Sequence, residues 1–291
     1  MDEKQLPYLY LALPILLWSA VPAVAKLALS ELTNFQLLFF NSIVAVVSLS
    51  LAILLRDKFH HFSEYKKTDY LKMFGMGFLG IYLYYVLLYG SFALVPSGQA
   101  NMINYLWPTF VVIFSIPILG EKFNLKTFLA ILISFAGALI VFTGGDFSSF
   151  SNEHSFGYLL AAGGAIFYGL FSVLGKKVRY EKFTSMLVYY VSSLILITPT
   201  VYFTSGLVIP TKITTFLAIL FMGGFASSLG FVFWFKALDA GHTHKIANAI
   251  YFVPFLALVW VQLLNNEAVP VISIFGLVLI AGGILIQAKK K

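Results

Sequence analysis

The stretch Trp18–Lys26 (WSAVPAVAK) recurs in altered form as Tyr168–Lys176 (YGLFSVLGK), 150 residues further along the chain. The pair Phe39-Phe40 matches the pair Tyr189-Tyr190 at the same spacing in the sequence. Self-similarity at a fixed spacing is the sequence signature of a repeated structural unit. The sequence therefore predicts two copies of one fold within this chain of 291 residues.

The matching continues toward the end of each copy, at a spacing of 146 residues. There Pro108 matches Pro254, Glu121 matches Glu267, and Gly137 matches Gly283. We expect the two glutamates to mark the ends of helical hairpins, with a gating role as the alternative. These positions divide the chain into a first repeat over residues 1–145 and a second over residues 152–291.

Composition places both repeats in a membrane. The chain is 60% hydrophobic and 11% charged, whereas a soluble domain carries about 25% charged residues. There is no cysteine, which excludes a disulfide framework and a thiolate metal site. A helix that crosses the hydrocarbon core needs about 20 apolar residues. The sequence offers ten such stretches: 7–29, 34–55, 72–94, 98–119, 125–143, 156–175, 184–205, 213–235, 246–264 and 270–288.

Five spans in each repeat make an odd number, so the second repeat enters the membrane from the opposite side. The predicted fold is an all-α membrane protein with ten transmembrane helices in two inverted five-helix repeats. Inverted repeats are typical of secondary transporters, whose substrate site lies near the midplane where the halves meet. The alternative is a duplication that serves packing alone, as in a channel or a scaffold.

The basic residues predict the orientation. If the 56–71 connection is cytoplasmic and the other connections alternate, 17 of the 19 lysines and arginines fall on the cytoplasmic side. Only Lys26 and Lys212 fall outside it. Both termini are then cytoplasmic and the location is the inner (cytoplasmic) membrane. The net charge of +7 thus reflects topology, and we expect lipid but no nucleic acid as a partner.

The stretch Met102–Lys122 (MINYLWPTFVVIFSIPILGEK) resembles the fourth helix of the drug/metabolite transporter superfamily, in its ten-span EamA type. It looks closest to the aromatic amino acid exporters of that group. Gly144-Gly145-Asp146 and Tyr251-Phe252-Val253-Pro254 also fit this pattern. The resemblance implies two inverted EamA repeats, alternating access, and export of amino acids or related metabolites.

Amides and aromatic rings supply the candidate binding groups. Asn101, Asn104 and Tyr105 share one face of the fourth span, and an amide without a partner in hydrocarbon costs about 1–3 kcal/mol, so these side chains should point inward. Aromatic rings suit flat or cationic solutes. The alternative roles are helix–helix hydrogen bonding for the amides and lipid-facing packing for the rings. The predicted substrate-binding residues are Trp18, Tyr82, Tyr85, Asn101, Asn104, Tyr105, Trp107, Tyr168, Trp234, Asn248 and Tyr251.

Ionisable groups are missing from the predicted spans. All 12 acidic residues and all five histidines lie in connections or at span ends, whereas a proton or sodium relay normally uses such groups within the membrane. Lys26 and Lys236 are expected to anchor span ends at the interface. No catalytic group, metal site or cofactor is predicted, so the chain should not be an enzyme. We expect a largely uncoupled carrier of small metabolites, most simply amino acids including aromatic ones; the alternative is a multidrug exporter of lipophilic cations.

Overall fold

The computed structural model describes residues 5–56, 59–95, 97–122, 124–146, 152–265 and 271–288, and these residues form helices and connections without any strand. The first half contains α1 (Leu6–Ala28), α2 (Asn34–Leu55), α3 (His61–Glu64), α4 (Lys67–Gly77), α5 (Tyr84–Phe92), α6 (Ser97–Asn104), α7 (Trp107–Leu119) and α8 (Leu125–Thr143). The second half contains α9 (Ser155–Lys177), α10 (Lys182–Thr204), α11 (Ile213–Phe221), α12 (Leu229–Ala240), α13 (Thr243–Ala249), α14 (Phe252–Asn265) and α15 (Ile272–Ala288). A short 3₁₀ turn, Asn152–His154, precedes α9.

Within the described residues, seven continuous helical segments are long and apolar enough to cross a membrane. They are Leu6–Ala28, Asn34–Leu55, Lys67–Phe92, Gln99–Leu119, Ser155–Lys177, Lys182–Thr204 and Ile213–Ala240. Two shorter apolar segments, Leu125–Val141 and Ile272–Ile286, match the fifth and tenth predicted spans. The ninth predicted span is divided between α13 and α14. A multi-pass helical architecture follows, while the count of ten spans stays a prediction.

Local sequence signals set several helix ends. Thr33 and Gln36 form a reciprocal capping box at the start of α2. The side chain of Asn124 accepts from the backbone N–H of Lys126, at 2.9 Å, and so caps α8. α7 stops at Gly120, which adopts a left-handed conformation with φ of 70° that favours glycine.

Two spans contain a π-helical turn. Phe78–Leu83 joins α4 to α5, and Met222–Ser227 joins α11 to α12, at corresponding places 144 residues apart. Such wide turns inside an α-helix are frequent at functional sites. They rotate the side chains that follow relative to those that precede.

Two further spans are broken just before a proline. The helix is interrupted between α6 and α7, ahead of Pro108, and between α13 and α14, ahead of Pro254. Proline lacks an N–H and its ring clashes with the carbonyl four residues earlier, which belongs to Asn104 in one case and to Ile250 in the other. In a membrane, irregular backbone is tolerated where it is buried in protein or lines a cavity.

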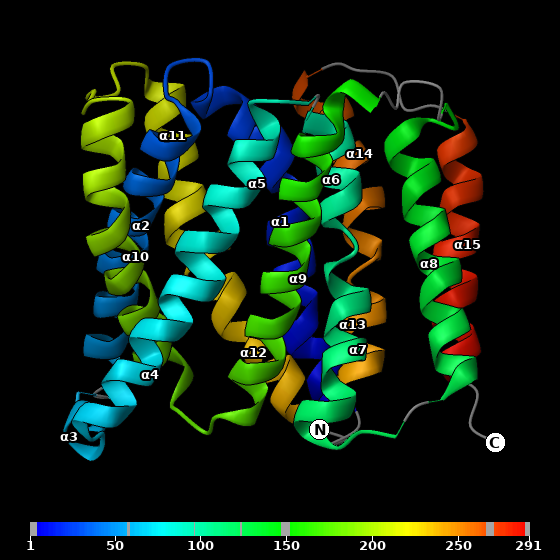
Figure 1. The fold of residues 1–291 in the computed structure, drawn as a ribbon, viewed down its shortest axis with the longest axis horizontal. Helices are drawn as coiled ribbons and strands as arrows, with labels where there is room; N and C mark the ends of the chain where they lie inside the picture. Colours follow the sequence, from blue (N-terminus) through cyan, green and yellow to red (C-terminus); the bar gives the residue numbers. More distant parts are fainter. Residues whose placement is uncertain are drawn as a thin grey trace.

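The helices form one bundle with different pairs at its two edges (Figure 1). α8 packs along α15 at one edge, where Gly137 approaches Gly276 so closely that an added Cβ would lie 2.5 Å from a backbone oxygen. α2 packs against α10 at the other edge. α1, α5, α7, α9, α12 and α14 lie between these edges and surround the candidate site. The start of α1 and the end of α15 lie on the same side of the bundle as α3.

Candidate functional site

A cavity of about 590 Å³ lies in the centre of the bundle. Its walls come from the second half of α1, from the start of α2, from α5, α6, α7, α9, α12 and α14, and from the π-helical turn Met222–Ser227. It reaches the surface along α1, where Pro22, Lys26 and Ser30 are exposed. Leu29 and Ser30 of this end adjoin the α1–α2 connection, which lies on the opposite side of the bundle from α3 (Figure 1).

The open end is bordered by a clasp between the two halves. The carboxylate of Glu31 in the α1–α2 connection accepts from the backbone N–H of Thr211, at 2.6 Å, and from that of Lys212, at 3.2 Å. Hydrogen bonds from Thr211 hold the pKa of Glu31 at about 2, so this carboxylate is anionic at neutral pH. The clasp fixes the α1–α2 connection against the start of α11.

Aromatic rings form the inner end of the cavity. The rings of Trp18, Trp107 and Tyr168 line it, and the Trp107 and Tyr168 rings meet edge to face with centroids 4.8 Å apart. Trp234 stands directly behind them, with its ring centroid 5.2 Å from that of Trp107. Its indole N–H donates to Ser172 Oγ at 3.2 Å. The layer is therefore packed and hydrogen-bonded, and it closes the cavity toward the α3 side.

The polar groups of the wall are amides and tyrosine hydroxyls. The side-chain N–H of Asn104 donates to the hydroxyl of Tyr84 at 3.2 Å. Asn104 lines the cavity, and its Oδ1 is buried without a hydrogen-bond partner within the protein. An unpaired buried amide oxygen costs about 1–3 kcal/mol, so a small rotation that brought it to a donor on a bound molecule would be favourable. Asn101, Tyr85, Tyr89 and Tyr105 add further polar atoms.

Among the described residues that line the cavity, Lys26 is the one with a charged side chain. It is exposed at the mouth, one turn beyond Pro22 on the same face of α1 as Trp18. A lysine at the mouth of an otherwise uncharged cavity raises the local concentration of anionic groups and opposes cations.

Seven of the eleven predicted binding residues line this cavity, and the structure places the other four around it. The seven are Trp18, Tyr85, Asn101, Asn104, Tyr105, Trp107 and Tyr168. Trp234 forms the layer behind the wall. Tyr82 turns toward α10, where its hydroxyl lies 2.9 Å from Thr200 Oγ1. Tyr251 and Asn248 are fully buried on the α3 side of the cavity, where α13 and α14 meet α7 and α8.

The two residues on that side differ in their hydrogen bonds. The Tyr251 hydroxyl lies 2.9 Å from Thr109 Oγ1. Neither polar atom of the Asn248 side chain has a partner within the protein. Asn248 is therefore a second buried amide with an unsatisfied oxygen, and its amide nitrogen is unsatisfied as well.

Several wall residues were not predicted from the sequence. They are Val21, Pro22, Ala25, Lys26, Leu29 and Ser30 of α1 and its end, Leu37 of α2, Tyr84, Leu88, Tyr89 and Phe92 of α5, Met222, Ala226 and Ser227 of the π-helical turn, and Phe231, Ile250, Val253 and Ala257. The α1 residues could have been found, because Trp18, Pro22, Lys26 and Leu29 recur every three or four positions on one helix face. The π-helical residues carry no comparable signal.

A polar cluster closes the α3 side of the bundle and joins the two halves. The Lys176 ammonium donates to Thr243 Oγ1 at 2.7 Å and to the carbonyl of Gly241 at 2.9 Å, and lies 3.7 Å from Glu121 Oε1. The Thr243 hydroxyl also donates to Glu121, which His244 approaches to 3.9 Å. A second bridge, Lys182 Nζ to Asp239 Oδ2 at 2.9 Å, links α10 to α12.

The charge state of Glu121 follows from these neighbours. Burial alone would raise the pKa of this carboxyl, but hydrogen bonds from His244 and Thr243 and the charge of Lys176 outweigh burial and lower it to about 2. The carboxylate is thus anionic throughout the neutral range. Its predicted counterpart, Glu267, lies outside the described residues.

A helical bundle with a central cavity, open at one end and closed at the other, is the architecture of a membrane carrier. The sequence matches the EamA-like transporter family twice, over residues 5–143 and 155–288, and the chain belongs to this family. It is accordingly a multi-pass membrane transporter and not an enzyme. A solved crystal structure with 20% sequence identity superimposes with a TM-score of 0.85, over 98% of this chain and 97% of the other, which shows the shared fold.

The curated relatives carry different names. An uncharacterized transporter of Archaeoglobus fulgidus is 24% identical over 97% of this chain and 98% of its own length. The pseudopaline exporter CntI of Pseudomonas aeruginosa is 25% identical over 94% of this chain and 93% of its own. The aromatic amino acid exporter YddG of Ancylobacter novellus is 29% identical, but over 35% of this chain and 36% of its own.

Proposed function

We propose that this chain is an uncoupled secondary carrier that exports neutral amino acids, aromatic ones included, by alternating access. The central cavity is its substrate site in an outward-facing conformation. The observation that carries the proposal is the wall itself, in which aromatic rings line the same cavity as Asn104, whose side-chain oxygen has no partner within the protein, and Lys26 stands at the mouth. The volume falls within the usual range of small-molecule sites, about 300–1,000 Å³.

The wall offers a partner for each part of such a substrate. A zwitterion in a site of low dielectric constant needs partners for both charges. The ammonium group can donate to Asn104 Oδ1 and to tyrosine oxygens, the carboxylate is drawn by Lys26, and an aromatic side chain stacks among Trp18, Trp107 and Tyr168. The partial match to an aromatic amino acid exporter supports this substrate class.

Two inverted five-helix repeats would supply the alternation. Three matched features support this arrangement: π-helical turns 144 residues apart, helix breaks ahead of Pro108 and Pro254, and a family match to each half separately. In the inverted arrangement, the amide of Asn248 becomes accessible to the substrate when the protein opens on the α3 side. The α3 side opens when the contacts among Glu121, Lys176 and Thr243 break.

The open side is the outer side of the membrane. The predicted cytoplasmic side holds most of the basic residues and includes α3, and the cavity opens at the opposite end. We place the protein in the inner membrane with both termini in the cytoplasm on this basis.

Lipophilic cations are the alternative substrates, since aromatic rings also bind cations. Lys26 argues against them, and no carboxylate lines the cavity within the described part of the chain. The test is uptake into proteoliposomes of purified protein, with a panel of amino acids and lipophilic cations, before and after an ionophore collapses the proton gradient. Uptake of neutral amino acids that persists after the ionophore supports the proposal. Uptake of cations alone, or loss of uptake with the ionophore, overturns it.

A further inference from the structure

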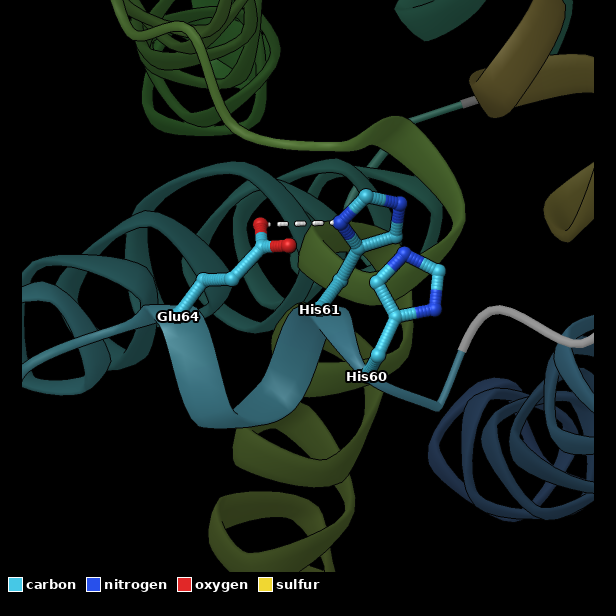
Figure 2. A group of neighbouring side chains, drawn as sticks. All are labelled: His60, His61 and Glu64. Carbon is cyan, nitrogen blue, oxygen red and sulfur yellow. Dashed lines mark hydrogen bonds and ion pairs between the residues drawn. The ribbon is translucent and has the colours of Figure 1, made fainter.

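The connection between α2 and α4 brings three potential metal ligands together, although the sequence alone predicts no metal site. His60 precedes α3, His61 begins it and Glu64 ends it. Their ligand atoms all lie within 4.8 Å of one another, and none of the three side chains is buried. His61 Nδ1 is 2.9 Å from Glu64 Oε2, and the two imidazole rings lie 4.2 Å apart (Figure 2).

The backbone that carries these side chains is held in place. The Ser63 hydroxyl donates to the carbonyl of His60 at 2.7 Å, and the Tyr70 hydroxyl of α4 donates to that of Phe62 at 2.8 Å. Just beyond α3, the Tyr65 hydroxyl accepts from the backbone N–H of Glu181 at 2.8 Å. The turn is thereby fixed to α4 and to the α9–α10 connection. A ligand set on a fixed turn loses little conformational entropy when it binds.

We propose that His60, His61 and Glu64 form a binding site for one divalent transition-metal ion, of the zinc or nickel type. Two imidazoles and a carboxylate are ligands typical of these ions, whereas magnesium and calcium favour oxygen ligands alone. Three protein ligands leave a further coordination position for water. The ion takes the place of the proton between His61 Nδ1 and Glu64 Oε2, and that proton moves to Nε2 of the same ring.

Only small movements are needed to reach metal geometry. Tetrahedral ligands at about 2.0–2.1 Å from zinc lie roughly 3.3 Å from one another. The His61–Glu64 pair is already closer than this, and rotation of the exposed His60 ring supplies the third ligand.

The test uses the full chain without a polyhistidine tag, stripped by a chelator and kept in detergent. Zn²⁺ and Ni²⁺ are titrated against a chromogenic competitor. We expect one site, with binding weakened about tenfold or more by His60→Gln and by His61→Gln. Magnesium in excess should not compete. The control is the double variant His242→Gln/His244→Gln, which removes the other histidine pair, whose rings are 5.7 Å apart.

Affinity that is unchanged in both His60→Gln and His61→Gln, or lost in the control, would overturn the proposal. X-ray absorption of the zinc-loaded protein gives a second readout, in which scattering from two imidazole rings is expected. Circular dichroism and size exclusion of each variant show whether the fold is retained. Since α3 lies at the opposite end of the bundle from the mouth of the cavity, these results do not depend on the transport assay.

Discussion

The indole N–H of Trp18 donates to the carbonyl oxygen of Ala226 at 3.0 Å, and so links the first helix of the chain to the π-helical turn of the second half. This bond fixes the ring that forms the inner end of the cavity. Gly230 allows it, since an added Cβ there would lie 2.7 Å from the indole nitrogen. The position of the Trp18 ring thus depends on the absence of a side chain at Gly230.

We therefore expect Gly230→Ala to displace the Trp18 ring and weaken substrate binding. Overpacking of this kind costs about 1–3 kcal/mol, which corresponds to roughly a 5- to 150-fold rise in the apparent KM if it falls on the bound state. The measurement is the concentration dependence of uptake in proteoliposomes. The control is Trp260→Phe, which removes an indole hydrogen bond to Ser19 of 2.9 Å outside the cavity wall. Equal effects of the two variants would contradict the assignment.

A second prediction concerns the side-chain oxygen of Asn104, which has no hydrogen-bond partner within the protein. Asn104→Leu keeps the approximate size of the side chain, removes the acceptor, and also removes the donor to Tyr84. We expect a rise in the KM of amino acid uptake of about tenfold, because one hydrogen bond to a charged group is worth about 1.5–3 kcal/mol. Tyr84→Phe is the matched control, since it removes the bond between the two side chains but leaves Asn104 Oδ1 in place. If Tyr84→Phe has the larger effect, the amide serves packing rather than the substrate.

Substitution of Lys26 distinguishes the two candidate substrate classes, amino acids and lipophilic cations. Lys26→Gln removes the cation at the mouth, so uptake of amino acids should fall and uptake of lipophilic cations should rise, if there is any. Lys26→Arg should retain most of the amino acid uptake because it keeps the charge. Competition between phenylalanine and its carboxamide, which lacks the carboxylate, gives the decisive comparison. A preference for phenylalanine that survives in Lys26→Gln would contradict the role given to the lysine.

Seven of the eleven residues proposed from the sequence line the candidate cavity, because the signals that selected them are local. The Asn-Tyr-Leu-Trp-Pro stretch supplies three of the lining residues, which stand out because polar amides are unusual within an apolar span. The helix break ahead of Pro108 was not predicted, since the fourth span was expected to be continuous over 98–119. Tyr82 shows where such reasoning stops. It was predicted to bind substrate together with Tyr85, but the π-helical turn Phe78–Leu83 alters the rotation between the two side chains and directs Tyr82 toward Thr200.

Other features of the site depend on contacts between helices, which the spacing of residues in the sequence does not reveal. A lysine that anchors a span end and a lysine that lines the mouth of a cavity have the same local sequence, so Lys26 was assigned to the interface. Trp234 lies one layer behind the wall because Trp107 stands in front of it, which is a matter of packing between helices. Conversely, His60, His61 and Glu64 are neighbours in the sequence, and only the turn of α3 shows that their ligand atoms converge.

The cluster that closes the α3 side predicts how access alternates. Glu121→Gln removes the anion that faces Lys176 and weakens the contact between α7 and the start of α13. A loss of about 1–3 kcal/mol from the closed conformation shifts the population about 5- to 150-fold toward opening on this side. Because the chain has no cysteine, Asn248→Cys provides a single reporter in the enclosed half. We expect a membrane-impermeant maleimide to label it faster from the α3 side when Glu121→Gln is also present.

Glu31→Gln is the control for this experiment. It also removes a carboxylate that holds two connections together, but at the open end of the bundle. Loosening that end offers no new route to Asn248 from the α3 side, so labelling there should not rise. Labelling that rises equally in both variants would mean general destabilisation, and labelling unchanged by Glu121→Gln would mean that the cluster does not control access. Faster labelling in Glu121→Gln alone leaves one explanation, which is that this anion holds the inner side closed while the cavity is open to the outside.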